Sequence, residues 1–191
     1  LLCTRNFERI YNVACVIRAF ARVQARHEEA ALTLVGSGSQ ETALRELARR
    51  LKVRNVTFAG RVPHADVNRY YGDADLYVQT PWVDNMPLSV LEAFASGLPV
   101  VSTEVGGVPS LLRHGVYGLL APENDDEAVA RHVLALLESP SYARQLAVNA
   151  YRSCAAYEWP VARKGWLAAY EDVLESRSRP TPSPEPSHES I

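Results

Sequence analysis

The fold of this chain is decided by the stretch "LYVQTPWVDNMPLSVLEAFASGLPVVST", which runs from Leu76 to Thr103. An apolar run from Leu76 to Gln79 is followed by helical periodicity from Pro87 to Ser96 and by a second apolar run from Pro99 to Thr103. Gly97 stands where a helix that ends before the second run needs a left-handed residue. Two apolar runs joined by one helix predict parallel strands in a right-handed βαβ unit.

The same alternation extends over most of the chain, and after Pro122 it gives way to helical patterns alone. Further strands are predicted at Leu1 to Thr4, Leu32 to Val35, Val56 to Ala59 and Gly118 to Ala121. Further helices are predicted at Val13 to Arg26, Gln40 to Leu51, His64 to Tyr71, Val108 to His114, Asp125 to Glu138, Ser141 to Cys154 and Trp159 to Ser176. The pattern predicts an α/β protein: a Rossmann-like parallel sheet of about six strands with helices on both faces, followed by C-terminal helices.

The composition changes near the C-terminus. Residues 176–191, "SRSRPTPSPEPSHESI", are rich in proline and serine and hold almost no apolar side chain. Such a segment buries too little surface to offset its ordering entropy, so it is predicted to be disordered. One globular domain is therefore expected over residues 1–175. Its abrupt start in an apolar strand suggests a domain cut from a longer protein.

The bulk composition argues against several classes of function. A formal net charge of −2 over 191 residues, with both signs interspersed, offers no basic stripe for nucleic acid. Cys3, Cys15 and Cys154 are odd in number and form no C-x-x-C pair, so neither a disulfide framework nor a zinc site is expected. A reduced, cytoplasmic compartment is therefore expected. No apolar run reaches the roughly 18 residues that suggest a membrane span.

One pair of acids, Asp73 and Asp75, has the D-x-D spacing that holds a divalent metal in some sugar-transferring enzymes. The pair lies between a helix end and a strand start, where acids commonly finish a turn, so a structural role is favoured. The five histidines are scattered, with no acid or cysteine at ligand spacing. No metal and no other cofactor is expected.

In an open parallel sheet, ligands bind beyond the carboxyl ends of the strands, so the loops at that edge are the candidate sites. The loop "VGSGSQ" holds Gly36 and Gly38, but Glu41 stands where a dinucleotide-binding fingerprint has its third glycine. Two interpretations of these glycines stay open: close approach of the backbone to a ligand, and a simple turn from strand to helix.

The helix from Pro87 and the loop before it carry a polar stripe. With Asp84 or Asn85 as the N-cap, the side chains of Asn85, Ser89 and Glu92 fall within about 60° of one another around the helix axis. The helix N-terminus offers free N–H groups to a pyrophosphate, and a carboxylate farther along can accept hydrogen bonds from a ribose diol. Alternatively, Glu92 belongs only to the solvated face of an amphipathic helix.

A second glycine pair, Gly106 and Gly107, precedes the helix predicted from Val108. The N-terminus of that helix is expected to converge with the N-terminus of the helix from Pro87 at one edge of the sheet. Two convergent helix N-termini suit an extended anionic ligand.

These segments together resemble the C-terminal domain of retaining glycosyltransferases with the GT-B fold, of the family 4 type. The resemblance covers Leu1 to Tyr170 and is carried by Arg5, "VGSG", "FAGRV", "ADLYVQTPWVDNMPLSVLEAFASGLPVVSTEVGGVPSLL", "GVYGLLAP" and "EW". It implies a nucleotide-sugar-binding half of a GT-B fold. It also implies an N-terminal acceptor-binding domain, which is absent from these residues.

The family signature is E-x(7)-E, whose first acid faces the transferred sugar and whose second binds the donor ribose. Glu92 matches the second acid, whereas Asp84 stands in place of the first. Arg5 matches the arginine that binds the diphosphate, and Tyr11 stands where a lysine is usual. The resemblance implies further donor contacts, with sugar and diphosphate from Asn85, Met86, Pro87 and Leu88, and with the base from Arg61 and Val62.

By resemblance, the activity is metal-independent transfer of a sugar to an acceptor hydroxyl with retention, in which the departing diphosphate helps to deprotonate the acceptor. The expected partners are a nucleotide sugar and the acceptor-binding domain. A peripheral association with a membrane, made through that domain, is left open as a further option. The isolated domain is expected to be inactive or weak. Two alternatives are a non-catalytic nucleotide-sugar-binding module, suggested by Asp84 and Tyr11, and a nucleotide-sugar epimerase, against which the D-x(7)-E spacing argues.

Overall fold

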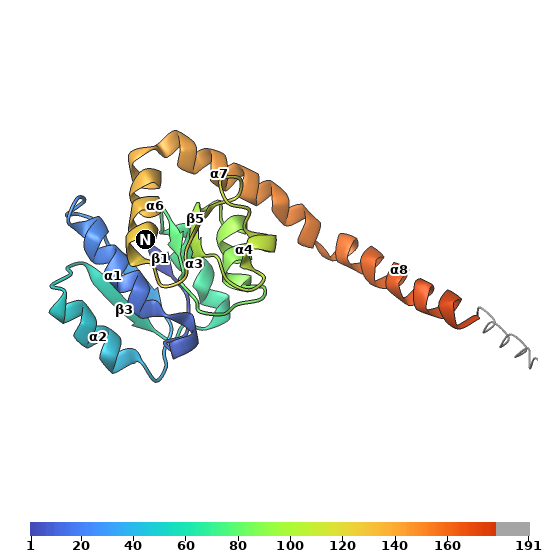
Figure 1. The fold of residues 1–191 in the computed structure, drawn as a ribbon, viewed down its shortest axis with the longest axis horizontal. Coiled ribbons are helices and arrows are strands. Elements are labelled where there is room, and N and C mark those ends of the chain that lie inside the picture. Colours follow the sequence, from blue (N-terminus) through green and yellow to red (C-terminus); the bar gives the residue numbers. More distant parts are fainter. Residues whose placement is uncertain (179–191) are drawn as a thin grey trace, which may run out of the picture. The chain divides into compact units, whose positions relative to one another are not determined.

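A computed structural model describes residues 1–178, and its core is one six-stranded parallel sheet with the order β3-β2-β1-β4-β5-β6 (Figure 1). The strands are β1 (Leu2–Cys3), β2 (Leu32–Val35), β3 (Val56–Gly60), β4 (Tyr77–Val78), β5 (Val100–Thr103) and β6 (Leu119–Ala121). The predicted fold class and all six predicted strands are confirmed. The two central strands, β1 and β4, are shorter than predicted because the chain leaves the sheet early there to form loops.

The strand order reverses beside β1. From β1 the chain adds β2 and β3 in one direction, and it then returns to place β4, β5 and β6 on the other side of β1. The loops after β1 and β4 therefore leave the same edge of the sheet in opposite directions, which opens the crevice where ligands bind in such folds.

Helices cover both faces of the sheet (Figure 1). One face packs against α1, α2 and α6 around buried Phe20, and the other packs against α3, α4 and α5 around buried Phe94. The helices of this part of the chain are α1 (Val13–Gln24), α2 (Glu41–Arg50), α3 (Val67–Gly72), α4 (Leu88–Ala95), α5 (Val108–Leu111), α6 (Asp126–Glu138) and α7 (Pro140–Ser153). The short 3-10 turns are η1 (Arg9–Tyr11), η2 (His64–Asp66) and η3 (Cys154–Tyr157). The helix predicted from His64 is thus split into η2 and α3.

Helix α4 begins differently from the prediction. Its N-cap is Pro87, and neither Asp84 nor Asn85 caps it, because the Asp84 carboxylate is bonded to a distant arginine instead. The predicted C-terminal stop is confirmed: Gly97 has a φ of 73°, and its N–H bonds to Phe94 O at 3.0 Å. Helix α5 is also shorter than predicted, since Leu112 already adopts an extended conformation.

The residues after Cys154 form a separate compact unit. It contains α8 (Trp159–Ser178), within which the rings of Trp166 and Tyr170 stack at 6.2 Å. Helix α8 reaches Ser178, so residues 176–178 are helical where a disordered tail was predicted. The rest of the predicted tail, residues 179–191, lies outside the described residues. Within residues 1–178, no helix is both long enough and apolar enough to cross a membrane.

Candidate active site

Arg5, in the loop that follows β1, is the centre of the candidate site. Its Nη2 lies 2.5 Å from Oδ2 of Asp84, in the loop after β4, and its Nη1 donates to Oγ of Ser89 in α4 at 3.1 Å. The guanidinium also lies over the ring of Tyr11, 4.1 Å from the ring centroid. The side chains of Arg5 and Asp84 are only 11% and 13% exposed, so the ion pair is largely shielded from water. The structure thus brings together three predicted site residues from both sides of the crevice.

One donor of Arg5 is not used. Its Nε is buried and has no hydrogen-bond partner within the described part of the chain. Buried polar groups are rarely left unpaired, and unsatisfied cationic donors are costly. An anionic oxygen placed at this nitrogen would satisfy it with a charge-assisted hydrogen bond.

The loop with Asp84 and Asn85 rests on the glycine pair after β5. A Cβ at Gly106 would lie 2.3 Å from Asp84 O, and a Cβ at Gly107 would lie 2.0 Å from Asn85 O. Both positions therefore need glycine for the two backbones to pack this closely. The predicted convergence of the two loops is found. However, the N–H of Gly107 bonds to Asp84 O at 3.0 Å, so it is not free for a ligand as predicted.

The start of α4 presents backbone donors without partners. The N–H groups of Asn85, Met86, Leu88 and Ser89 form no hydrogen bond within residues 1–178. Met86 and Leu88 are exposed, by 49% and 68% respectively, so this turn is accessible. Free N–H groups at a helix N-terminus beside an arginine form a local anion-binding surface.

Glu92, on α4, is held by a buried tyrosine. The hydroxyl of Tyr71, in α3, donates to Oε2 of Glu92 at 2.8 Å and lies 2.7 Å from Oγ1 of Thr4. On the other side, Oε1 of Glu92 is 3.8 Å from Nδ1 of the exposed His64. Burial raises the pKa of Tyr71, so its hydroxyl stays protonated and can donate. Glu92 is therefore part of an ordered network and not only of a solvated helix face.

The sequence pattern did not identify three residues of this network, Thr4, His64 and Tyr71. The apolar pattern of the sequence predicts that Tyr71 belongs to the hydrophobic core, and it is indeed only 1% exposed. Its hydroxyl becomes relevant only because the fold places α3 beside α4. His64 belongs to the scattered histidines that have no neighbour at ligand spacing in the sequence.

A buried polar network lies beneath the site. Oγ of Ser89 donates to Oε1 of Gln79 at 3.1 Å, and Nε2 of Gln79 donates to Oγ of Ser102 at 3.2 Å. The hydroxyl of Tyr77 lies 3.4 Å from the same oxygen of Gln79 and 3.3 Å from Oγ1 of Thr4. These bonds link the neighbourhood of Arg5 to that of Glu92, so the two ends of the site share one ordered support.

Gly36 and Gly38 support the Arg5 loop. A Cβ at Gly36 would lie 2.2 Å from Arg5 O, and a Cβ at Gly38 would lie 2.6 Å from Phe7 O. The N–H of Phe7 bonds to Ser37 O at 2.9 Å. The close approach that these glycines allow is therefore to the chain's own backbone, which positions the residues after β1.

Arg61 and Val62 follow β3 at the same edge of the sheet. Val62 packs against the apolar cluster beneath α3 and α4, and Arg61 is exposed. Neither forms a hydrogen bond or ion pair with Arg5, Asp84 or Glu92 within the described residues. Their assignment to the base stays a prediction.

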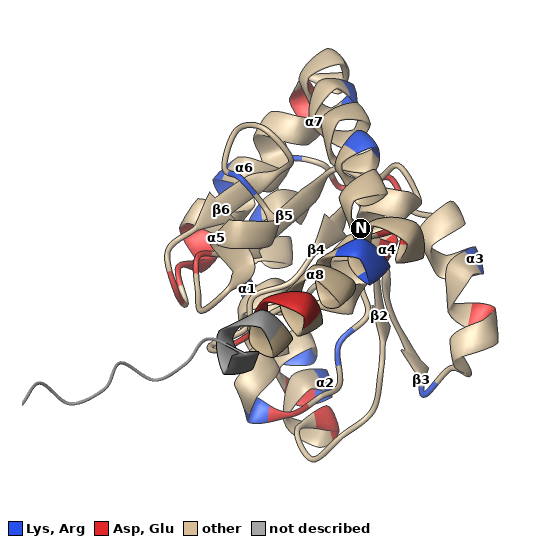
Figure 2. Ribbon diagram, turned by 90° about the vertical axis from the view of Figure 1, so that its right-hand side faces the viewer, with Lys and Arg blue, Asp and Glu red and all other residues tan. Residues whose placement is uncertain are grey.

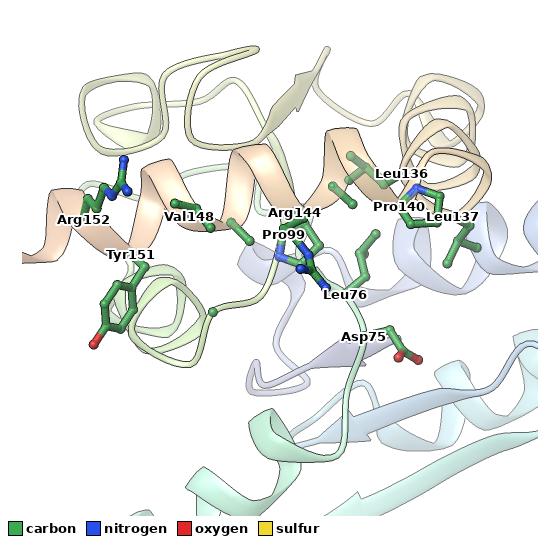
Figure 3. A pocket seen from close by; sticks show the side chains of 13 residues that line it. Asp75, Leu76, Pro99, Leu136, Leu137, Pro140, Arg144, Val148, Tyr151 and Arg152 are labelled. Atoms are coloured by element: carbon green, nitrogen blue, oxygen red, sulfur yellow. The ribbon is translucent and has the colours of Figure 1, made fainter.

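A sizeable cavity lies elsewhere. It measures about 700 Å³ and is lined by Leu76 and Pro99, which precede β4 and β5, and by residues of α6 and α7. Figure 3 shows Arg144 extending from α7 toward Pro99 over mostly apolar walls. The cavity is therefore at the amino ends of the strands, opposite Arg5 and Glu92.

Charge is distributed without a dominant sign. Figure 2 shows basic and acidic residues on the same elements, and α2 pairs Arg45 with Glu41 and Arg49 with Glu46. In the part of the chain that the structure describes, no group of three or more histidines, cysteines and acids could hold a metal ion.

The topology, with a polar site at the point where the strand order reverses, defines a Rossmann-like half-domain of the GT-B kind. Solved structures agree with this fold. A pneumococcal O-GlcNAc transferase, GtfA, solved with UDP and GlcNAc, has a TM-score of 0.80 at 18% identity, over 91% of this chain and 35% of the other. The Anabaena protein Alr3699/HepE, solved with UDP-glucose, has a TM-score of 0.79 at 22% identity, over 92% of this chain and 48% of the other.

Residues 1–153 match the family model described as glycosyl transferases group 1, and the chain belongs to this family. Among curated relatives, it is 30% identical over 154 residues to an N-acetyl-alpha-D-glucosaminyl L-malate synthase of Bacillus anthracis. That alignment covers 80% of this chain and 40% of the relative. The chain thus spans less than half the length of the relative that it matches.

Proposed function

We propose that this chain is the donor-binding domain of a glycosyltransferase that uses a nucleoside-diphosphate sugar and transfers the sugar with retention and without a metal. The observation that carries the proposal is the arrangement of Arg5, Glu92 and the unpaired N–H groups at the start of α4 along one edge of the sheet. This arrangement offers a cation and backbone N–H donors to a diphosphate, and a carboxylate to a ribose. Family relatives solved with UDP and UDP-glucose support a ligand of this class.

In the proposed reaction, the bond between the anomeric carbon and the diphosphate oxygen breaks, and its electron pair leaves with the diphosphate. Arg5 and the N–H groups of Leu88 and Ser89 stabilise the negative charge that develops there. The acceptor oxygen bonds to the same face of the sugar, and its proton passes to an oxygen of the departing diphosphate. This step needs no second carboxylate, in contrast to glycoside hydrolysis.

Asp84 and Glu92 take different roles in this proposal. Glu92 accepts hydrogen bonds from the ribose diol, and Asp84 contacts the donor sugar while it holds Arg5. Asn85, Met86, Pro87 and Leu88 line the sugar and diphosphate, and Arg61 and Val62 face the base.

The proposal extends to the whole protein. Transfer needs an acceptor-binding domain, so residues 1–191 alone should bind donor and transfer poorly. A cytoplasmic location is proposed because Cys3, Cys15 and Cys154 are all unpaired.

A second candidate is a non-catalytic nucleotide-sugar-binding module. It is favoured by the ion pair between Asp84 and Arg5, which already engages the carboxylate expected at the sugar. It is also favoured by Tyr11, which stacks on Arg5 where the family usually places a second cation.

Calorimetry with UDP, GDP and ADP tests the donor site. At least one should bind, Glu92→Ala should weaken the binding, and Asp84→Ala should matter mainly when the corresponding nucleotide sugar replaces the nucleotide. No binding by any of the three at millimolar concentration would refute the donor site. Binding and sugar discrimination without transfer, after fusion to the acceptor domain of a relative, would favour the second candidate.

A further inference from the structure

We infer that Tyr71 is a positioning residue that orients the Glu92 carboxylate toward the ribose diol of the bound nucleotide. The inference rests on the proposed function, since it assigns a support to the ribose-binding acid. Its starting point is the hydrogen bond of 2.8 Å from the Tyr71 hydroxyl to Oε2 of Glu92. Tyr71 is buried, so we assign it no direct contact with the ligand.

The donors in this network can be assigned from chemistry. The Tyr71 hydroxyl has two acceptors, Oε2 of Glu92 at 2.8 Å and the carbonyl oxygen of Ser89 at 3.3 Å. The carboxylate is both the closer and the stronger acceptor, so the single hydroxyl proton of Tyr71 points to Glu92. The 2.7 Å contact between Tyr71 and Thr4 must then be a bond that Thr4 donates. Oγ1 of Thr4 is also the donor in a longer contact of 3.3 Å to the Tyr77 hydroxyl, so the shorter distance favours the bond to Tyr71. The Thr4 hydroxyl thus supports the Tyr71 hydroxyl, which in turn donates to the carboxylate.

The position of Tyr71 is rigid. It is 1% exposed, and its ring lies 5.8 Å from the ring of Tyr77, which is 0% exposed. Glu92, in contrast, is a flexible side chain that is 32% exposed. A fixed donor that holds one oxygen of a flexible carboxylate reduces the conformational entropy that is lost when a ligand binds.

The orientation leaves one oxygen on the open side. Oε2 of Glu92 points to the buried phenol, whereas Oε1 lies 3.8 Å from His64, whose side chain is 88% exposed. Oε1 is thus the oxygen that first meets a ribose hydroxyl, and Oε2 keeps a free lone pair for the second. Without the Tyr71 hydroxyl, the carboxylate would be free to rotate toward solvent or toward His64.

The test measures a diol preference, defined as the Kd of 2′,3′-dideoxy-UDP divided by the Kd of UDP. Both constants are measured by calorimetry on residues 1–191 as wild type, Tyr71→Phe, Tyr77→Phe and Glu92→Ala. Tyr77→Phe is the matched control, because it also removes one buried hydroxyl from the network but none in contact with Glu92. Thermal unfolding of each variant checks that it folds.

We expect a wild-type diol preference above about tenfold, as for two hydrogen bonds to a charged group. Tyr71→Phe should lower it by about threefold to tenfold, Tyr77→Phe should leave it within about twofold of wild type, and Glu92→Ala should abolish it. If Tyr71→Phe does not fold, Thr4→Val, which removes the hydroxyl that contacts both Tyr71 and Tyr77, should lower the preference by about twofold to threefold.

Two kinds of failure are distinct. A preference that survives Tyr71→Phe, or survives Thr4→Val where that variant is needed, but disappears in Glu92→Ala would overturn the role of Tyr71 and leave the donor site standing. Equal losses from Tyr71→Phe and Tyr77→Phe would also overturn it, since the effect would then be general to the network. A wild type that binds UDP without any diol preference, or does not bind it at all, would overturn the ribose assignment itself.

Discussion

Substituting Gly107 by alanine tests whether the two loops of the site depend on their close approach. The added Cβ would lie 2.0 Å from Asn85 O, whereas real Cβ atoms stay beyond 3.0 Å. The backbones must therefore separate by about 1 Å. The φ of Gly107 is −87°, which alanine adopts freely, so only the clash is tested.

The expected loss has two parts. Overpacking against an immobile backbone costs about 1 to 3 kcal/mol. Losing the bond from Gly107 N to Asp84 O adds about 1 kcal/mol. Gly107→Ala should thus lower the unfolding free energy by about 2 to 4 kcal/mol. It should also weaken UDP binding by at least about tenfold, because an error of about 1 Å displaces Asp84 and the N–H groups beside it.

Gly72→Ala is the matched control. Gly72 ends α3, and a Cβ there would meet no atom within 4 Å. The control should be neutral or more stable by about 0.4 to 1 kcal/mol, because alanine restricts the unfolded chain. Urea unfolding followed by circular dichroism gives the free energies, and calorimetry gives the UDP affinity. If Gly107→Ala unfolds within about 0.5 kcal/mol of wild type and keeps its UDP affinity, the proposed packing constraint is wrong.

Three further predictions concern charge, pH and burial. Tyr11→Lys adds a cation beside Arg5 and should raise UDP affinity by about threefold to tenfold at low salt, with a smaller gain at high salt, by calorimetry at two ionic strengths. Burial lowers the pKa of His132, so the unfolded state takes up a proton before the folded state as the pH falls, and the free energy of unfolding decreases. Urea unfolding at pH 7 and pH 5 should show this decrease in the wild type and a smaller decrease in His132→Gln. Gln24→Leu removes bonds of 2.7 and 2.8 Å to the backbone of Arg54 and should lower the unfolding free energy by about 2 to 4 kcal/mol, while UDP affinity stays unchanged.

The fold could be predicted because apolar periodicity reports burial directly. The run from Leu32 to Val35 matches β2 at both ends, and its residues bury three of four side chains fully. The errors lie at element ends, where burial no longer decides the backbone. Asp84 shows this most clearly: local propensity predicts a helix cap, but an ion pair with Arg5, 79 positions away in the sequence, takes the carboxylate.

The site could be predicted only at the level of loops and single residues. The topology rule places Arg5, Asp84 and Glu92 at one edge of the sheet, and the family resemblance assigns their roles. The network around these residues depends on hydroxyl groups of side chains that lie in the apolar core, above all Tyr71. In an apolar pattern, a buried tyrosine cannot be distinguished from a phenylalanine. Which buried groups form hydrogen bonds with one another depends on three-dimensional packing, and the sequence pattern alone does not determine it.

The pairing of Asp84 with Arg5 bears on whether a shorter acid can serve in this position. Arg5 has five N–H donors, and within the described residues one is directed to Asp84, one to Ser89, and the Nε–H to no partner. In the proposed function, donors that Arg5 does not use within the described residues bind a phosphate oxygen, while Asp84 keeps the guanidinium oriented. Because Asp84 O is anchored to Gly107 N, the short side chain is directed at Arg5 from a fixed backbone. In the proposed function, Asp84 therefore supports the arginine that binds the diphosphate in addition to contacting the donor sugar, so the shorter acid keeps a role at this position.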